Sequence, residues 1–92
     1  MNLSVQVKIF CFFKGDFIKN NFEIKISDKI TFKEFIAQLR KNKKITPDFE
    51  KEINKNESPL MILVNGKRVE TNNNEFLQDG DTISVLSPLA GG

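Results

Sequence analysis

The sequence ends in the two residues best suited to covalent chemistry, Gly91 and Gly92. A glycine pair commonly marks a turn or a helix end, but both of these need chain on either side. At the end of a chain, a pair without Cβ atoms forms a thin tail that can be threaded into the narrow active site of another protein. We therefore predict that the Gly92 carboxylate is a reactant, against the alternative that the last residues are simply frayed.

Other routes to catalysis are scarce in this composition. The sequence contains no His, which excludes Ser-His and Cys-His nucleophile pairs and His-based metal sites. Cys11 is the single cysteine, so an intrachain disulfide and a Cys-x-x-Cys site are excluded, and its place on the apolar side of a strand predicts a buried thiol. Asp79-Gly80-Asp81 is typical of a turn. We predict no metal site and no bound cofactor.

Size and charge place the chain in a broad class. Its 92 residues suit one small domain, and 39% hydrophobic with 28% charged residues is typical of a globular protein. No apolar run approaches the ~20 residues that span a bilayer, and the first residues do not resemble a signal peptide, so we expect a cytoplasmic protein without membrane contact. The net charge of +2 and a solvated Lys/Arg cluster at 40–44 do not indicate nucleic-acid binding.

Residues 3–13 alternate between apolar and polar, which predicts a strand with one buried face. Lys14-Gly15-Asp16 is a turn signal, and Phe22–Ile26 alternates again, so the two segments are expected to form a hairpin. A capping box, Thr31 with Glu34, starts a helix. Its apolar face comprises Phe32, Phe35, Ile36 and Leu39.

Thr46-Pro47 starts a second, shorter helical segment that carries Phe49 and Ile53 inward. The continuous apolar run Leu60–Val64 predicts a strand covered on both faces, and Asn65-Gly66 turns the chain into a returning arm from Lys67 to Glu70. Thr82–Leu86 is the last strand, with Ile83 and Val85 toward the core.

The order of these elements predicts an α+β protein of the β-grasp class, with a mixed sheet packed on one main helix. The first and last strands are expected side by side and parallel in the centre of the sheet. We assign residues 1–87 to this domain and residues 88–92 to a flexible Gly-Gly tail.

Strand parity identifies a candidate binding surface. Phe10 and Phe12 lie on the side of their strand opposite Val7 and Ile9, and Leu86 lies opposite Ile83 and Val85. If the first and last strands are neighbours, Phe10, Phe12 and Leu86 form one apolar patch on the sheet face away from the helix. A large exposed apolar patch beside a reactive tail suggests a docking surface, and the alternative is a patch covered by a loop.

The motifs of the second half resemble a known family. Val64-Asn65-Gly66, then Leu77-Gln78-Asp79-Gly80-Asp81, then Pro88-Leu89-Ala90-Gly91-Gly92 are similar to the ubiquitin-like sulfur carriers (MoaD/ThiS-like), most of all to the small subunit of molybdopterin synthase. Val7–Cys11 resembles the first strand of that family. Two positions depart from its pattern: a charged Arg-Glu segment is replaced by Phe13–Asp16, and a second proline near the tail is Ser87.

The resemblance implies a function. An E1-like adenylyltransferase would use ATP to adenylate the Gly92 carboxylate, and a persulfide from a sulfurtransferase would displace AMP to give a thiocarboxylate. The tail, Pro88 to Gly92, would enter the large subunit of molybdopterin synthase and donate sulfur to a pterin precursor. The chain would then be a non-catalytic, sulfur-donating subunit, with Phe10, Phe12, Leu86, Pro88, Leu89 and Ala90 in contact with its partners.

Other functions need the same activated terminus. The sulfur acceptor could instead belong to thiamin thiazole synthesis, cysteine synthesis or tRNA thiolation, although thiazole carriers are usually shorter and lack a second helical segment. A ubiquitin-like protein modifier would join Gly92 to a lysine of a target protein. A plain binding module would use no covalent step.

Overall fold

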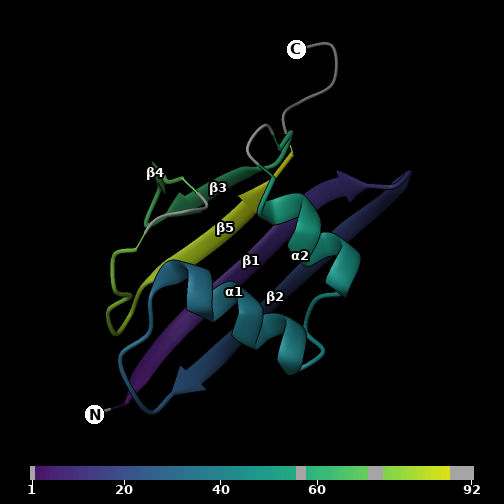
Figure 1. The fold of residues 1–92 in the computed structure, drawn as a ribbon. Coiled ribbons are helices and arrows are strands. Elements are labelled where there is room, and N and C mark those ends of the chain that lie inside the picture. The colour runs from purple at the N-terminus through teal and green to yellow at the C-terminus, as the bar shows by residue number, and fades with distance from the viewer. Residues whose placement is uncertain (1, 56–57, 71–73, 88–92) are drawn as a thin grey trace.

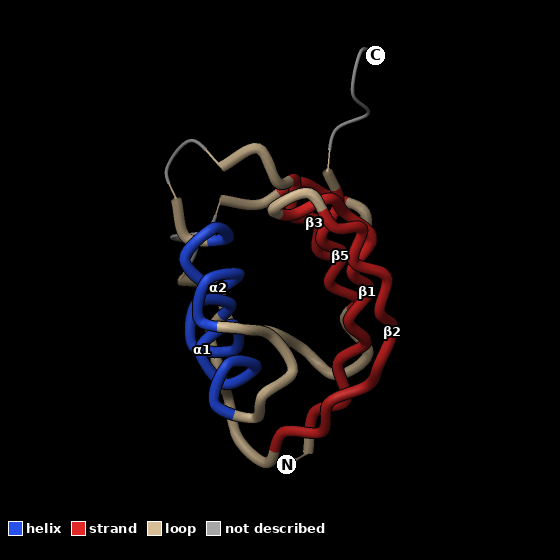
Figure 2. The backbone as a smooth tube through the Cα atoms, turned by 90° about the vertical axis from the view of Figure 1, so that its right-hand side faces the viewer, coloured by secondary structure: helices blue, strands red, loops and turns tan. Residues whose placement is uncertain are grey.

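The computed structural model describes residues 2–55, 58–70 and 74–87 of the chain. A five-stranded mixed sheet is covered on one face by two helices, while none of the described residues forms a helix on the other face (Figures 1 and 2). The strand order is β2-β1-β5-β3-β4. The elements are β1 (Leu3–Phe13), β2 (Asp16–Ile26), α1 (Phe32–Lys41), α2 (Pro47–Ile53), β3 (Met61–Val64), β4 (Lys67–Arg68) and β5 (Thr82–Leu86).

The central pair of strands is the one that the element order predicts. β1 and β5 are parallel neighbours, with Val7 opposite Ile83 and Ile9 opposite Val85. All four of these side chains are buried under the helices. Because β5 brings the end of the domain alongside β1, the β-grasp prediction is confirmed.

The β1–β2 hairpin is longer than the sequence pattern indicated. β2 begins at Asp16 rather than near Phe22, and it pairs with β1 along its whole length. Residues 16–21 show no clean alternation because β2 is an edge strand with few buried side chains. The turn itself is tight, with left-handed backbone at Lys14 (φ 52°) and Gly15 (φ 82°).

Helix α1 begins and ends at recognisable caps. The Thr31 hydroxyl accepts from the Glu34 backbone N–H at 3.2 Å, and the Glu34 carboxylate accepts from the Thr31 N–H at 2.9 Å. At the other end Lys44 N–H donates to Leu39 C=O at 2.9 Å, and Lys43 N–H donates to Arg40 C=O at 3.0 Å. This is a Schellman cap with Lys43 in the left-handed conformation (φ 61°).

The second helix is present as predicted. Thr46 caps α2 by accepting from Phe49 N–H at 3.1 Å, and Pro47 occupies the first position. Phe49 and Ile53 are buried, and an Arg40–Glu50 ion pair of 2.7 Å joins α2 to α1. Within the described ranges, neither helix is long and apolar enough to cross a lipid bilayer.

The prediction that residues 60–64 are covered on both faces is wrong. Leu60 and Ile62 are buried on the helix side, but Met61 and Leu63, which lie on the outer face, are only partly buried. The reason is that, among the described residues, no second layer covers the outer face of the sheet. The returning arm is also short, since only Lys67 and Arg68 form β4.

Candidate functional site

The start of β5 is held by the Asp79–Asp81 turn, which performs the structural role that its sequence predicts. Ser4 N–H donates to Asp79 Oδ1 and Gly80 N–H donates to Ser4 C=O, both at 2.8 Å. Asp81 Oδ2 accepts from Gln78 N–H at 2.8 Å. These bonds fix the entry of β5 against the beginning of β1, and no group of acidic, Cys or His side chains in the described ranges could hold a metal ion.

The Asn65-Gly66 turn adds a second clamp on the same end of β5. Asn65 is in the left-handed region (φ 53°), where its side chain reaches two groups across the sheet. Its Nδ2 donates to Asp81 Oδ1 at 2.8 Å, and its Oδ1 accepts from Thr82 N–H at 2.9 Å. The family-like motifs at 64–66 and 77–81 are therefore one connected hydrogen-bond network in space.

The exit of β5 lies beside the exposed phenylalanines. Leu86 faces Phe10 of β1 on one side and Met61 of β3 on the other. One residue later, the Ser87 hydroxyl accepts from the Phe12 backbone N–H at 3.1 Å. This bond continues the contact of the chain with β1 past the last ladder pair, at a position where the family pattern has proline.

Three phenylalanines form an aromatic patch on the outer face of the sheet. Phe10, Phe12 and Phe17 are 50%, 63% and 46% exposed. The Phe17 ring contacts both others, at centroid distances of 4.8 Å to Phe10 and 4.9 Å to Phe12. Lys19 lies over the Phe10 ring at 5.9 Å, and Leu86 and Met61 continue the patch across the sheet.

The other half of the outer face is polar. Ser4 Oγ donates to Glu23 Oε2 at 2.5 Å, and Gln6 Nε2 donates to Asn21 Oδ1. The apolar groups are therefore gathered at the end where the chain leaves β5. Such a concentration of large apolar side chains at one end of a face is typical of a protein interaction site.

Phe10, Phe12 and Leu86 lie on one face of the sheet, as predicted from strand parity, with Leu86 partly buried. Phe17 and Met61 lie on the same face and were not predicted from the sequence. The register of the hairpin, with Phe12 opposite Phe17, brings Phe17 onto the same face. Reading Lys14-Gly15 as a two-residue hairpin turn would have found it, because the position opposite each residue then follows by counting.

The predicted chemistry at the tail lies outside the described residues. Pro88, Leu89, Ala90, Gly91 and Gly92 are not among them, so their roles stay predictions. The buried Cys11 has no access to solvent, and burial raises the pKa of its thiol. Its side chain belongs to the core under the helices, on the opposite face of the sheet from the exposed phenylalanines.

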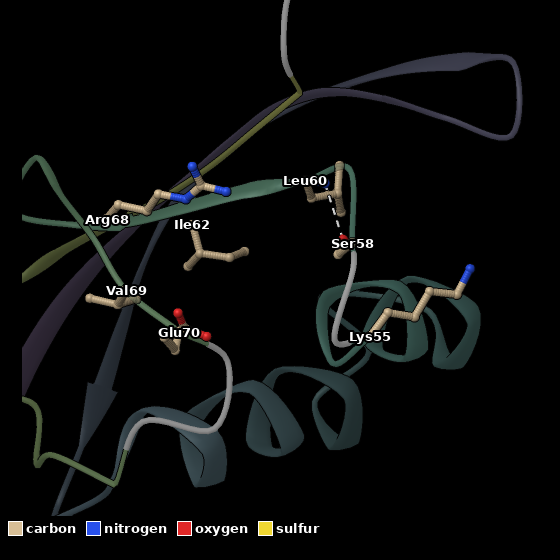
Figure 3. Close-up of a pocket in the computed structure, with 7 residues that line it drawn as sticks. All are labelled: Lys55, Ser58, Leu60, Ile62, Arg68, Val69 and Glu70. Carbon is tan, nitrogen blue, oxygen red and sulfur yellow. Dashed lines mark hydrogen bonds between the residues drawn. The ribbon is translucent and has the colours of Figure 1, made fainter.

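One hollow lies elsewhere on the molecule, away from the aromatic patch. It has a volume of about 300 Å³ and lies between α2 and the β3–β4 arm (Figure 3). Its floor is Leu60 and Ile62, and its rim carries charges of both signs, including Lys55 and Glu70. Lys55 already pairs with Glu52 at 2.9 Å, and the Ser58 hydroxyl accepts from Leu60 N–H at 3.0 Å. These are structural contacts, and the described residues around the hollow hold no acid–base pair in position for catalysis.

Known proteins give two kinds of similarity. The sequence matches the ThiS family over residues 12–92. A Pyrococcus furiosus protein named as a candidate molybdopterin converting factor, subunit 1, superposes with a TM-score of 0.65 at 26% identity, covering 95% of this chain and 99% of that one. No protein of curated function matches the sequence.

A second solved structure supports the fold alone. The HVO 2177 protein of Haloferax volcanii superposes with a TM-score of 0.63 at 21% identity. The match covers 99% of this chain and 88% of that protein.

Proposed function

The chain belongs to the ThiS family of ubiquitin-like sulfur carriers, and from this premise we propose that it is the small, sulfur-donating subunit of a molybdopterin synthase. The observation that carries the proposal is the full-length similarity to the Pyrococcus furiosus protein, at 26% identity over nearly all of both chains. The presence of α2 agrees with this branch, because the shorter thiazole carriers were expected to lack it. The aromatic patch beside the exit of β5 offers the partner a place to bind.

The chemistry resides in the Gly92 carboxylate. An E1-like enzyme transfers AMP from ATP to this carboxylate, releasing pyrophosphate and creating a good leaving group. A persulfide sulfur from a sulfurtransferase then displaces AMP. The terminal sulfur of the persulfide is then bonded to the Gly92 carbonyl, as an acyl disulfide with the sulfurtransferase cysteine. A second thiol of the partner attacks the sulfur of that cysteine and forms a disulfide with it, which breaks the S–S bond to the carrier and leaves a C-terminal thiocarboxylate.

The aromatic patch is proposed to dock first on the E1-like enzyme and then on the large subunit of the synthase. Both encounters must present the same tail to an active site, so a single docking face beside the tail serves both. Leu86 and Ser87, the last described residues before the tail, are both held against β1. General acids and bases for the reaction come from the partners.

Intact-mass measurement tests this function. We expect the chain, incubated with the E1-like enzyme, ATP and a sulfur source, to gain the mass difference between sulfur and oxygen. Deleting Gly92, or adding one residue after it, should abolish the gain without changing the unfolding transition. If the extended chain still acquires sulfur at its terminus, Gly92 is not the reactive residue.

The acceptor is tested separately. The thiocarboxylated chain, mixed with the synthase large subunit and a pterin precursor, should return to its original mass as the dithiolene forms. Return of the mass only with a thiazole, cysteine or tRNA acceptor would assign the carrier to that pathway. Attachment of Gly92 to lysines of other proteins would instead identify a modifier.

A further inference from the structure

In the part of the chain that the structure describes, strand β2 has no neighbour on its outer edge. It is the first strand in the sheet order, and it runs for eleven residues. In β1, Gln6 N–H donates to Asp81 C=O and Phe12 N–H donates to Ser87 Oγ. The backbone N–H and C=O groups of the even-numbered residues of β1 therefore point toward β5. The backbone groups of the odd-numbered residues of β1 point toward β2. In the register of the hairpin, these residues pair with the even-numbered residues of β2.

The backbone groups of the odd-numbered β2 residues consequently point away from the sheet. These residues are Phe17, Lys19, Asn21, Glu23 and Lys25. The hydrogen bond of the Asn21 N–H is consistent with this direction. It donates to Oδ1 of the neighbouring Asn20 at 3.0 Å rather than to β1. A row of outward N–H and C=O groups of this length is a template for pairing with another strand.

The sequence of this edge is complementary to itself. If two copies of β2 run antiparallel about Asn21, Lys19 lies directly opposite Glu23 of the second copy, on both sides of the two-fold axis. A shift of the register by two residues in one direction places Lys19 opposite Lys25 of the second copy. A shift by two residues in the other direction places Lys19 opposite Asn21. Since like charges facing each other are destabilising, only the Asn21-centred register pairs both charges.

The charged groups are available for this pairing. Lys19 has no carboxylate partner among the described residues, and it lies over Phe10 at 5.9 Å. Glu23 accepts one hydrogen bond, from Ser4, through Oε2. On the helix side of the strand the same register sets Ile18 opposite Ile24, so apolar side chains also meet.

We propose that this edge binds a second copy of the chain, forming an antiparallel β2–β2 dimer centred on Asn21. In such a pairing each Asn21 N–H leaves the Asn20 side chain and donates to the Asn21 carbonyl of the second copy. The two-fold axis is perpendicular to the sheet, so both helix layers lie on one side. Both aromatic patches remain open on the other side, and the dimer does not depend on the proposed sulfur chemistry.

Sedimentation equilibrium of the full chain, from micromolar to millimolar concentration, tests the dimer. We expect a concentration-dependent dimer in the wild type. Lys19→Glu and Glu23→Lys should each weaken it by about tenfold or more, because each creates two like-charge pairs per dimer. The double variant K19E/E23K restores opposite charges at both positions and should recover the wild-type dissociation constant.

A backbone variant gives an independent measurement. Asn21→Pro removes an outward N–H that makes no bond to β1, so the monomer should fold while the dimer is lost. Unfolding curves of every variant confirm that a change in mass is not a change in folding. A wild type that is monomeric at millimolar concentration, a double variant that stays monomeric, or an Asn21→Pro variant that still dimerises would each overturn the proposal.

Discussion

Phe10, Phe12 and Phe17 each keep about half of their surface in contact with water, at 50%, 63% and 46%. β1 and β2 pair with each other along their whole length, so the exposure of these rings is not due to an unpaired segment. It arises because their side chains point to the face that no helix covers. The rings contact one another edge-on or tilted, which buries part of their area without a partner.

This arrangement predicts the effect of charge on the patch. Phe10→Asp and Phe12→Asp should each weaken binding to the E1-like enzyme or the synthase large subunit by at least about tenfold, since a buried aromatic anchor commonly contributes ~2 kcal/mol to an interface. The matched control is Phe76→Asp. Phe76 is 56% exposed and lies outside the β-sheet, where it makes a single bridge to Thr31.

Affinity, by calorimetry, and the urea midpoint are measured for each variant. Binding should fall for the two patch variants and remain unchanged for the control. Equal losses for all three variants would mean that charge, rather than this surface, governs the interaction. Normal binding by folded Phe10→Asp and Phe12→Asp would assign the docking site elsewhere.

At the scale of elements, the α1 capping box has a pH dependence of known sign. The Thr31 backbone N–H, and then its hydroxyl, hold the pKa of Glu34 below the usual 4.5 of a glutamate. A group with a lowered pKa in the folded state stabilises the fold above its unfolded pKa, and that contribution is lost as the pH falls through the folded value. Stability from the capping box should therefore decline below pH 4.5.

Glu34→Gln isolates this contribution, because glutamine keeps the capping geometry but does not titrate. Urea denaturation at a series of pH values should show that the stability difference between wild type and variant shrinks as the pH falls below 4.5. The hydrogen bond and the charge of Lys14 lower the pKa of Asp48. Asp48 is present in both proteins, so its contribution cancels in the stability difference. Parallel pH profiles for the two proteins would contradict this role of Glu34.

The end of α1 contains a residue in an unfavourable backbone region. Lys43 is left-handed at the Schellman cap, a position that glycine occupies at lower cost. Lys43→Gly should therefore raise the free energy of unfolding by about 0.5–1 kcal/mol. Lys41→Gly is the matched control, since the same change two residues earlier, at the last helical residue of α1, should lower it by up to about 1 kcal/mol.

Urea denaturation of the two variants measures the change in the free energy of unfolding, and therefore the sign of each effect. Because Lys43 and Lys41 are exposed, lost packing contributes little to either value. A destabilised Lys43→Gly variant would show that the lysine side chain matters more than its backbone conformation.

At the scale of the whole molecule, Cys11 reports on global unfolding. It is fully buried in β1, between the sheet and the helices, and burial raises the pKa of its thiol. A raised pKa keeps the thiol protonated, and only the thiolate reacts with alkylating reagents. In the native protein at pH 8, we expect labelling to be far slower than for a free thiol and to become complete in urea.

The rate of labelling is followed by mass spectrometry against a small thiol of ordinary pKa. Reaction at the rate of the free thiol would mean that β1 opens locally. The same measurement serves the sulfur chemistry, because a thiocarboxylate on Gly92 would be alkylated while native Cys11 is not.

The sequence by itself determined those features that depend on neighbours along the chain. The Thr31–Glu34 and Thr46–Pro47 caps, the Asn65-Gly66 turn and the alternation of β1 all follow from local backbone chemistry. The order of elements was enough to predict parallel β1 and β5. The family match also rests on sequence, and it reaches to Gly92.

Only the tertiary structure decided what covers each surface. The apolar run of β3 looks buried on both faces, yet Met61 and Leu63 are partly exposed because none of the described segments forms a second layer over the outer face. Phe17 joins Phe10 and Phe12 through the hairpin register, and Ser87 reaches Phe12 across 75 positions of sequence. A side chain's type shows that it can be buried or bonded; which group buries or bonds it depends on distant segments that only folding brings together.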